Sequence, residues 1–470
     1  MTERTERAAS HPGAARFRGA GATGGRFGAA LRHRARRVDA ATPPDRDRAV
    51  DALRGFAILG VVLGHWLVTA LVADGDTLRA VSPLDPMPWL APVSWLFQTL
   101  AVFFLVGGHV ATRSLASARA RGIGYRPWLT ARLSRLFAPV LTVLTLWTVM
   151  AVALLLASAD LTTLYTLLKL ALSPLWFLLV FAALTAATPL LTRLSPLWPL
   201  AVVLHVDLVR FGLGGPDWLG WVNLAAGWLV PYTLGAAWTR GELERPRAGR
   251  TLLIGGAVTT AGLVAFGGYP ASMVGVPGAE VSNLNPPTLA AVTFGLAQCG
   301  LALLLRGPLR RWMRRPTAWA AVALLNLSAM TIFLWHQTAM MATTVTALSA
   351  GRLPGLHTRP DDLAWVAHRL AWLPVFAVAL AVCWAAFRFR EQGRPARGPR
   401  GRSRPTVVRA RHTPAPLPPA PPSPRSVSTS SPWTSSPSTA PSTAPSTPSS
   451  AFSAGREPVA AALRRRSTGV

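Results

Sequence analysis

The sequence predicts an all-α integral membrane protein, a bundle of about ten transmembrane helices with both termini in the cytoplasm. Three observations predict this class. Hydrophobic residues make up 51% of the 470 residues and charged residues only 14%, which is too apolar for an ordinary soluble chain of this length. Apolar runs of about 20 residues, the length that crosses a bilayer, recur along the chain. Arginines gather in every second loop between these runs.

The apolar runs give the position of each predicted span. In chain order the spans are about 50–73, 93–112, 136–158, 173–192, 197–213, 221–239, 251–268, 288–305, 318–348 and 367–387. Spans 197–213 and 221–239 are the weakest, because they are short or are interrupted by Asp207, Arg210 and Pro231. The run 162–172 is a candidate for a segment in the membrane interface before the fourth span.

Loop charges provide an independent test of this topology, because arginines in short loops collect on the cytoplasmic side. Loops 113–135, 240–250 and 306–315 are rich in arginine, whereas loops 74–92, 159–172, 214–220 and 267–287 contain acidic residues and few basic ones. An even number of spans keeps the arginine-rich tail inside. We therefore expect a multi-pass protein of the plasma membrane, with the lipid bilayer as a partner.

Two tails flank the predicted membrane domain, which covers residues 47–387. Residues 1–46 alternate arginine with alanine and glycine, and residues 388–470 are rich in Arg, Pro, Ser and Thr. Such compositions cannot bury enough apolar surface to offset the entropy of ordering. Both tails are predicted to be disordered.

The net charge of +29 does not indicate nucleic-acid binding. Lys169 is the only lysine, and the arginine surplus lies largely in the tails and cytoplasmic loops, without a recognisable nucleic-acid fold. Attraction to anionic lipid explains such a charge better. Cys299 and Cys383 lie inside predicted spans, so neither a disulfide framework nor a metal site is expected.

The first span carries charged residues and a histidine that are costly inside a membrane and therefore indicate function. Asp47, Asp51, Arg54 and His65 follow one another at spacings of 4, 3 and 11 residues. These spacings are close to whole turns of a helix, so the four side chains are expected on one face.

Five short motifs together resemble the acyltransferase-3 family of membrane O-acyltransferases. In chain order they are Arg48-Ala-Val-Asp51-Ala-Leu-Arg54-Gly55-Phe-Ala57 followed by His65, Phe103-Phe104-Leu-Val-Gly107-Gly108, Arg132-Leu-Ser-Arg135-Leu-Phe-Ala-Pro139, Leu175-Trp176-Phe177-Leu178 and Leu334-Trp335-His336. Gly107 stands where the family commonly has a serine. The resemblance covers residues 47–387 and implies ten helices and transfer of an acyl group, often acetyl, from a donor on the inner side to a carbohydrate, lipid or natural product.

Acyl transfer to an alcohol needs a base near neutral pH, and His65 is the candidate, as a general base ahead of a covalent acyl-histidine. Arg54 lies about 16 Å along the helix from His65, so we assign it to the phosphates of an acyl-CoA donor, with Asp51 or Asp47 orienting it. Arg132 and Arg135 are candidates to complete this phosphate clamp. No permanently bound cofactor is expected, and acyl-CoA, with acetyl-CoA as the first choice, is the expected co-substrate.

Further candidates for supporting the catalytic residue or contacting the acceptor are His336, Trp176, Asn283 and Asn285. Each has a structural alternative: the histidine could join helices, the tryptophan could pack, and Asn-Pro is an ordinary turn signal. A transporter or flippase of a glycan or lipid intermediate is the competing function, because intramembrane charges and Pro-broken segments suit transport as well.

Overall fold

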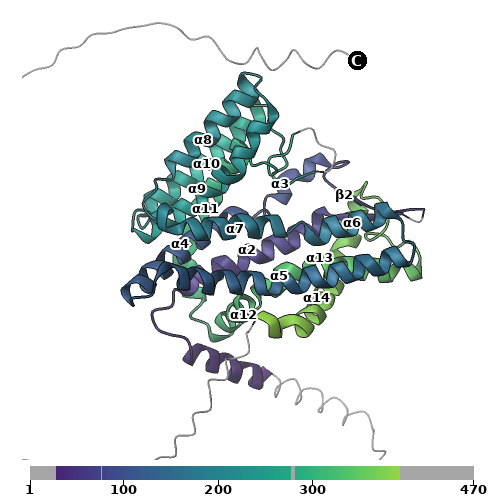
Figure 1. The fold of residues 1–470 in the computed structure, drawn as a ribbon, viewed down its shortest axis with the longest axis horizontal. Coiled ribbons are helices and arrows are strands. Elements are labelled where there is room, and N and C mark those ends of the chain that lie inside the picture. Colours follow the sequence, from purple (N-terminus) through teal and green to yellow (C-terminus); the bar gives the residue numbers. More distant parts are fainter. Residues whose placement is uncertain (1–27, 76, 277–280, 392–470) are drawn as a thin grey trace, which may run out of the picture. The chain divides into compact units, whose positions relative to one another are not determined.

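The computed structural model describes residues 28–75, 77–276 and 281–391, which are mostly helical (Figure 1). Most of the predicted tail segments, residues 1–27 and 392–470, lie outside the described residues. Residues 28–40, within the stretch expected to be a disordered tail, form a helix. Alanine, leucine and arginine, which have high helix propensity, dominate this stretch.

The first long helix, α2 (Arg48–Val68), begins at an N-cap, because the Asp47 side chain accepts a hydrogen bond from the Ala49 backbone N–H. It contains no proline. α2 ends earlier than the expected span 50–73, and strands β1 (Ala70–Asp74) and β2 (Thr77–Val81) follow as an antiparallel hairpin. Gly75 turns the chain between them at φ +58°. The all-α prediction is therefore corrected by one hairpin, whose Asp-Gly turn signal was visible in the sequence.

The remaining helices follow the predicted order. The short elements are η1 (Pro88–Leu90), α3 (Ala91–Ser94), η2 (Leu208–Gly212), η3 (Asp217–Trp221) and η4 (Leu348–Ala350). The longer helices are α4 (Leu100–Ala120), α5 (Tyr125–Leu156), α6 (Leu161–Leu172), α7 (Leu175–Leu191), α8 (Leu197–Asp207), α9 (Val222–Thr239), α10 (Pro246–Phe266), α11 (Leu289–Trp312), α12 (Pro316–Leu327), α13 (Ala329–Ala347) and α14 (Leu363–Glu391).

Within the described residues, seven helical segments are long and apolar enough to cross a membrane. One of them is α6 and α7 together, so run 162–172 belongs to the fourth segment. The pair formed by α12 and by α13 with η4 meets the same test only when taken together, and it is bent by 72°, so it adds an eighth segment only as one broken span. α8 has only 11 residues, and α9 is largely buried inside the protein. The predicted spans 197–213 and 221–239, which were the weakest in the sequence, thus do not meet the criteria of length and apolar character. The count of ten spans is not confirmed.

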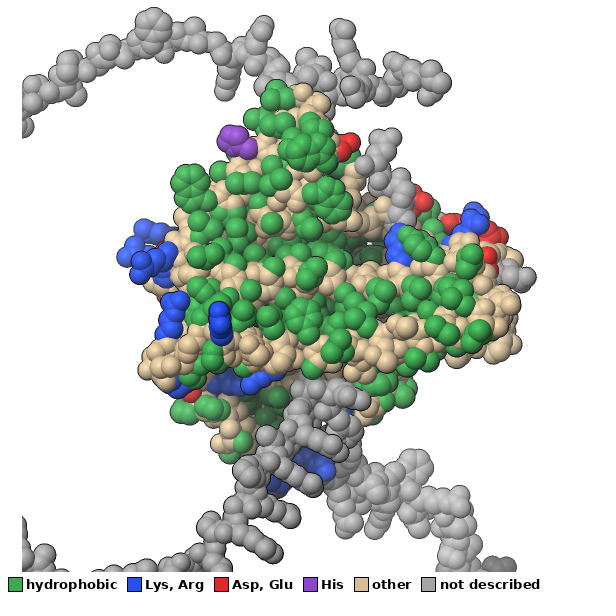
Figure 2. All heavy atoms as spheres, in the orientation of Figure 1, with side chains coloured by type: hydrophobic (Ala, Val, Ile, Leu, Met, Phe, Trp, Pro, Cys, Tyr) green, Lys and Arg blue, Asp and Glu red, His purple; other side chains and the backbone are tan. Residues whose placement is uncertain are grey.

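Loops that are rich in arginine meet at one end of the protein. Arg310 contacts Asp47 at 2.5 Å, Arg306 contacts Glu244 at 3.1 Å, and Arg240 donates to the Thr192 carbonyl. We call this the arginine end. The β1–β2 hairpin lies at the opposite, hairpin end, together with the start of α6. In Figure 2, hydrophobic side chains cover the middle of the displayed face, and most charged side chains lie toward its edges, as a membrane-spanning protein requires.

α2 lies at the centre of the packing and contacts α4, α11, α12, α13 and α14. α4 also crosses α9 at very close range, because a Cβ on Gly108 would collide with the Tyr232 carbonyl and one on Gly235 with the Leu105 carbonyl. Glycines at both crossing points allow this approach. The close packing fixes α4 beside α2, and these two helices form the inner walls of the site.

Candidate active site

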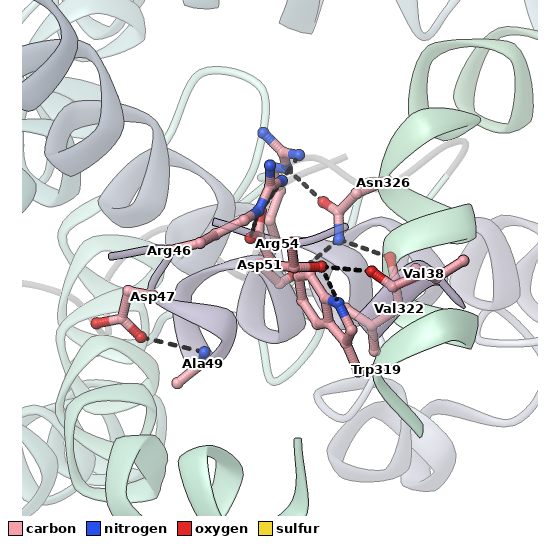
Figure 3. Close-up of polar contacts among 10 residues, drawn as sticks. Val38, Arg46, Asp47, Ala49, Asp51, Arg54, Trp319, Val322 and Asn326 are labelled. Carbon is pink, nitrogen blue, oxygen red and sulfur yellow. Dashed lines mark hydrogen bonds and ion pairs between the residues drawn. The ribbon is translucent and has the colours of Figure 1, made fainter. Parts of the chain in front are cut away.

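At the arginine end of α2, a buried carboxylate holds two guanidinium groups. Asp51 accepts from Arg46 at 2.7 and 3.1 Å and lies 3.6 Å from Arg54 (Figure 3). The Arg46 contact uses both carboxylate oxygens, the geometry in which arginine binds most specifically. Two positive charges therefore share one negative charge, and the cluster keeps a net positive charge.

Asn326 from α12 links Arg54 to the neighbouring helix. Its Oδ1 accepts from Arg54 Nε at 2.5 Å, and its Nδ2 donates to the carbonyls of Asp51 and Val322 at 2.8 and 2.9 Å. These contacts fix the direction of the guanidinium. The sequence analysis missed Asn326, although a polar residue inside the apolar run 318–348 was a usable signal.

Asp47 does not join this cluster, although the helical spacing placed it on the same face. It lies just before α2, and its carboxylate binds Arg310, with Arg306 at 3.9 Å, pointing away from Asp51 (Figure 3). Burial raises the pKa of the Asp47 carboxyl, but the hydrogen bond and charge of Arg310 outweigh burial, so this pKa lies below its usual value. The four residues predicted on one helix face are thus divided: Asp51 and Arg54 form the cluster, whereas Asp47 joins the start of α2 to α11.

A cavity of about 710 Å³ opens beside Arg54, and we call it the arginine cavity. Arg132 and Arg135 of α5 line it together with Arg54 and Asn326. Arg132 donates to the Val110 carbonyl at 3.4 Å and lies over the Trp128 ring. The three arginines proposed for the donor therefore share one cavity, where their charges suit a polyanionic ligand.

A surface groove of about 430 Å³ leads into this cavity from the arginine end. Arg46, Asp51, Arg54 and Arg113 line the groove. Arg54 lines both spaces, as do Val110 and Ser114. A large ligand could therefore occupy the groove and the arginine cavity together.

His65 lies near the other end of α2, where its Nδ1 is 3.1 Å from the Gln337 side-chain amide of α13. It lines a second cavity of about 490 Å³, the histidine cavity, together with Gln337, Trp176, Tyr165 and Lys169. Trp176, which was predicted to contact the acceptor, thus lines the same cavity as His65. Gln337, which the sequence analysis did not select, is the only side chain bonded to the His65 ring among the interactions described.

His336 lies beside His65, with 5.1 Å between the ring centroids, but it lines neither cavity. It is fully buried, and its Nδ1 donates to the Phe333 carbonyl at 2.6 Å. Within the described residues its Nε2 has no hydrogen-bond partner. Its backbone carbonyl accepts from Trp66 Nε1. His336 is therefore placed behind His65 in the buried interior and not in the lining of either cavity.

The two asparagines predicted to contact the acceptor do not line the histidine cavity, although Leu284 between them does. Asn283 is fully buried, donates to the Pro270 and Ser272 carbonyls and accepts from Thr288. These bonds hold the α10–α11 loop, so its side chain has a structural role. Asn285 precedes Pro286 in the same loop and does not line the cavity either.

Gly107 of α4 has no room for the serine common in similar sequences. A Cβ at this position would collide with the Phe181 ring of α7. A hydroxyl at this point is replaced by a close aromatic contact, so no catalytic role falls to residue 107. Within the described residues, no group of three or more His, Cys, Asp or Glu side chains could hold a metal ion.

Residues 47–388 match the family model of the acyltransferase-3 domain. The chain belongs to this family. It is therefore a multi-pass membrane acyltransferase, and the match begins at Asp47, the N-cap of α2. Comparisons with curated proteins and with solved structures gave no match.

Proposed function

We propose that the protein transfers an acyl group, acetyl in the first instance, from cytoplasmic acyl-CoA to a hydroxyl group of a carbohydrate, a lipid-linked glycan or a natural product. The observation that carries the proposal is the arrangement along α2. Arg54 lies in a cavity with Arg132 and Arg135, and His65 lies in the adjoining cavity. The donor's phosphates and the reacting hydroxyl thus have separate, neighbouring sites.

The arginine end suits the nucleotide part of acyl-CoA. Its phosphates would lie against Arg54, Arg132 and Arg135, which can form charge-assisted hydrogen bonds with them. Since α2 is unbroken, Arg54 and His65 stay about 16 Å apart along its axis. The flexible pantetheine arm can cover this separation and bring the thioester to the histidine. In this orientation the arginine end lies on the cytoplasmic side of the cell membrane.

At the histidine the reaction balances without a redox step. His65 takes the proton of the acceptor hydroxyl, and the oxygen attacks the thioester carbonyl carbon. A new C–O bond forms, the C–S bond breaks, and the proton passes from the imidazolium to the leaving thiolate. The products are the acyl ester and free CoA.

Gln337 selects the tautomer that this reaction needs. For Nε2 of His65 to accept a proton, Nδ1 must carry one and donate it. The amide oxygen of Gln337 can receive this hydrogen bond when the amide group is turned over, an orientation of the same shape. In the orientation described, that oxygen is buried without a partner among the described residues. We therefore assign Oε1 to the Nδ1–H of His65.

The lining of the histidine cavity favours a carbohydrate among the possible acceptors. Trp176 and Tyr165 present aromatic surfaces, and Thr162, Thr166 and Gln98 add hydrogen-bonding groups. Aromatic faces with nearby polar groups suit a sugar ring, which has both an apolar face and hydroxyl groups.

Membrane vesicles that contain the protein, given acetyl-CoA labelled in the acetyl group, test this function. The proposal predicts that label moves onto glycan or lipid material of the vesicles and that free CoA appears in equal amount. Movement of a glycan across the vesicle membrane without incorporation of label would instead support a transporter.

A further inference from the structure

Two aromatic rings form a common wall between the arginine cavity and the histidine cavity. Phe177 of α7 and Phe333 of α13 line both cavities. Their ring centroids are 5.4 Å apart, and the residues are 4% and 5% exposed. Rings at this distance are in van der Waals contact, so the pair is closed in this structure.

Neighbouring aromatic residues hold this wall in place. Phe103 and Phe104 of α4 contact the Phe177 ring edge-on, with centroid distances of 5.0 and 5.1 Å. Phe181, one turn further along α7, stacks on Phe177 at 6.4 Å. These side chains contain only carbon and hydrogen, so they offer no hydrogen bond to a group that crosses between the rings.

Phe333 is also coupled to the residues that surround His65. It precedes His336 and Gln337 by three and four positions on α13, and its carbonyl accepts the Nδ1–H of His336. The wall thus stands directly before the proposed base. Phe177 and Phe333 are the residues shared by the two cavity linings, so an acyl group carried from the arginine cavity to His65 passes these rings.

From this geometry, and resting on the proposed function, we infer that Phe177 and Phe333 are a specificity-determining gate that passes uncharged acyl groups and rejects acyl groups ending in a carboxylate. An acetyl group loses little on entering an apolar passage, whereas an ionised carboxylate loses its hydration without compensation. The substrate class is then the uncharged acyl thioesters, as opposed to succinyl-CoA and related donors.

Basic residues elsewhere in the histidine cavity do not compensate this cost. Lys169 and Arg79 line that cavity but are exposed at the hairpin end. Water and salt screen their charges, so they give little stabilisation to a carboxylate within the buried gate. The acyl group is therefore selected while it passes Phe177 and Phe333, and not by the site that it finally occupies beside His65.

The test compares labelled acetyl-CoA and succinyl-CoA as donors in the same vesicles. Both donors share the CoA part, so binding at the arginines cancels in the ratio of succinyl to acetyl transfer. We expect a low ratio in the wild type and a rise of about tenfold or more in Phe177→Ala and Phe333→Ala. Phe177→Leu and Phe333→Leu, which keep most of the apolar volume, are expected to give a smaller rise.

Leu133→Ala is the control, since Leu133 of α5 lines only the arginine cavity and is not one of the aromatic residues that hold the wall. Its ratio should stay within about twofold of the wild-type value. Equal use of both donors by the wild type overturns the gate, as does an unchanged ratio in both alanine variants. Absence of transfer from either donor by the wild type would be a different result, because it contradicts the proposed function itself.

Discussion

The Gln337 side-chain amide lies 3.1 Å from Nδ1 of His65, across the contact between α13 and α2. The two residues are 272 positions apart in the chain. This hydrogen bond orients the imidazole toward the histidine cavity and determines which ring nitrogen can take a proton.

Replacing Gln337 by alanine should lower kcat by about tenfold to a hundredfold, because the His65 ring loses its orientation and its tautomer is no longer fixed. Gln337→Glu should retain much more activity, since a carboxylate also accepts the Nδ1–H. In that variant the acid limb of the kcat/KM profile is expected at higher pH, because a negative charge stabilises the imidazolium.

The measurement for Gln337 is the pH profile of acetyl transfer for the three proteins, with the amount of folded membrane protein as control. If Gln337 has only a structural role, Gln337→Glu should be no more active than Gln337→Ala, and the acid limb of the kcat/KM profile should not shift.

Arg54→Ala should weaken donor binding. Loss of a charge-assisted hydrogen bond costs about 1.5–3 kcal/mol, which corresponds to a donor KM raised about tenfold to a hundredfold. Because Asn326 orients the guanidinium at 2.5 Å, Asn326→Ala should raise the same KM to a lesser extent. Steady-state kinetics with varied acetyl-CoA measures both effects.

Arg119→Ala is the control for the arginine variants, because Arg119 is an exposed residue of α4 that lines neither the arginine cavity nor the groove. Its donor KM should equal that of the wild type. An unchanged KM in Arg54→Ala would refute the phosphate clamp.

The Asp47–Arg310 pair should make stability depend on pH. The Asp47 pKa is lowered from 3.8 in the folded protein, so the carboxylate stabilises the fold above the unfolded pKa, and this contribution is lost as pH falls through the folded pKa. Asp47→Asn keeps an N-cap residue but removes the charge. At neutral pH this substitution is expected to lower the free energy of unfolding by about 1 kcal/mol or less, since the pair is partly exposed.

Thermal unfolding in detergent measures this difference. The gap in Tm between wild type and Asp47→Asn should be present near neutral pH and shrink as the pH falls below 3.8, the unfolded pKa. A gap that is the same above and below this pH would show that the charge of Asp47 does not act through the pair with Arg310.

Much of the fold was predictable because the pattern of apolar runs and arginine-rich loops is local. It gave the order of the helices and the end at which the arginines meet. The bend between α12 and α13 and the short α8 depend on tertiary packing, so an apolar run alone could not reveal them. The β1–β2 hairpin was missed because its apolar residues continued the hydrophobic run of α2.

The site was predictable where residues share one element. Spacing on a helix related Arg54 to Asp51, but it could not show that Asp47 turns to Arg310 of α11. Asn326, Gln337 and the Phe177–Phe333 wall are brought to the site from other helices. Such contacts are set by helix packing, which a single sequence does not specify.

In the proposed reaction, His65 accepts the proton of the acceptor hydroxyl. The most direct measurement is acetyl transfer from labelled acetyl-CoA by His65→Ala in membrane vesicles, normalised to the amount of folded protein and to donor binding. Transfer should fall to background while donor binding, which depends on the arginine end, is retained. Full transfer by His65→Ala would contradict the role of His65 as the base.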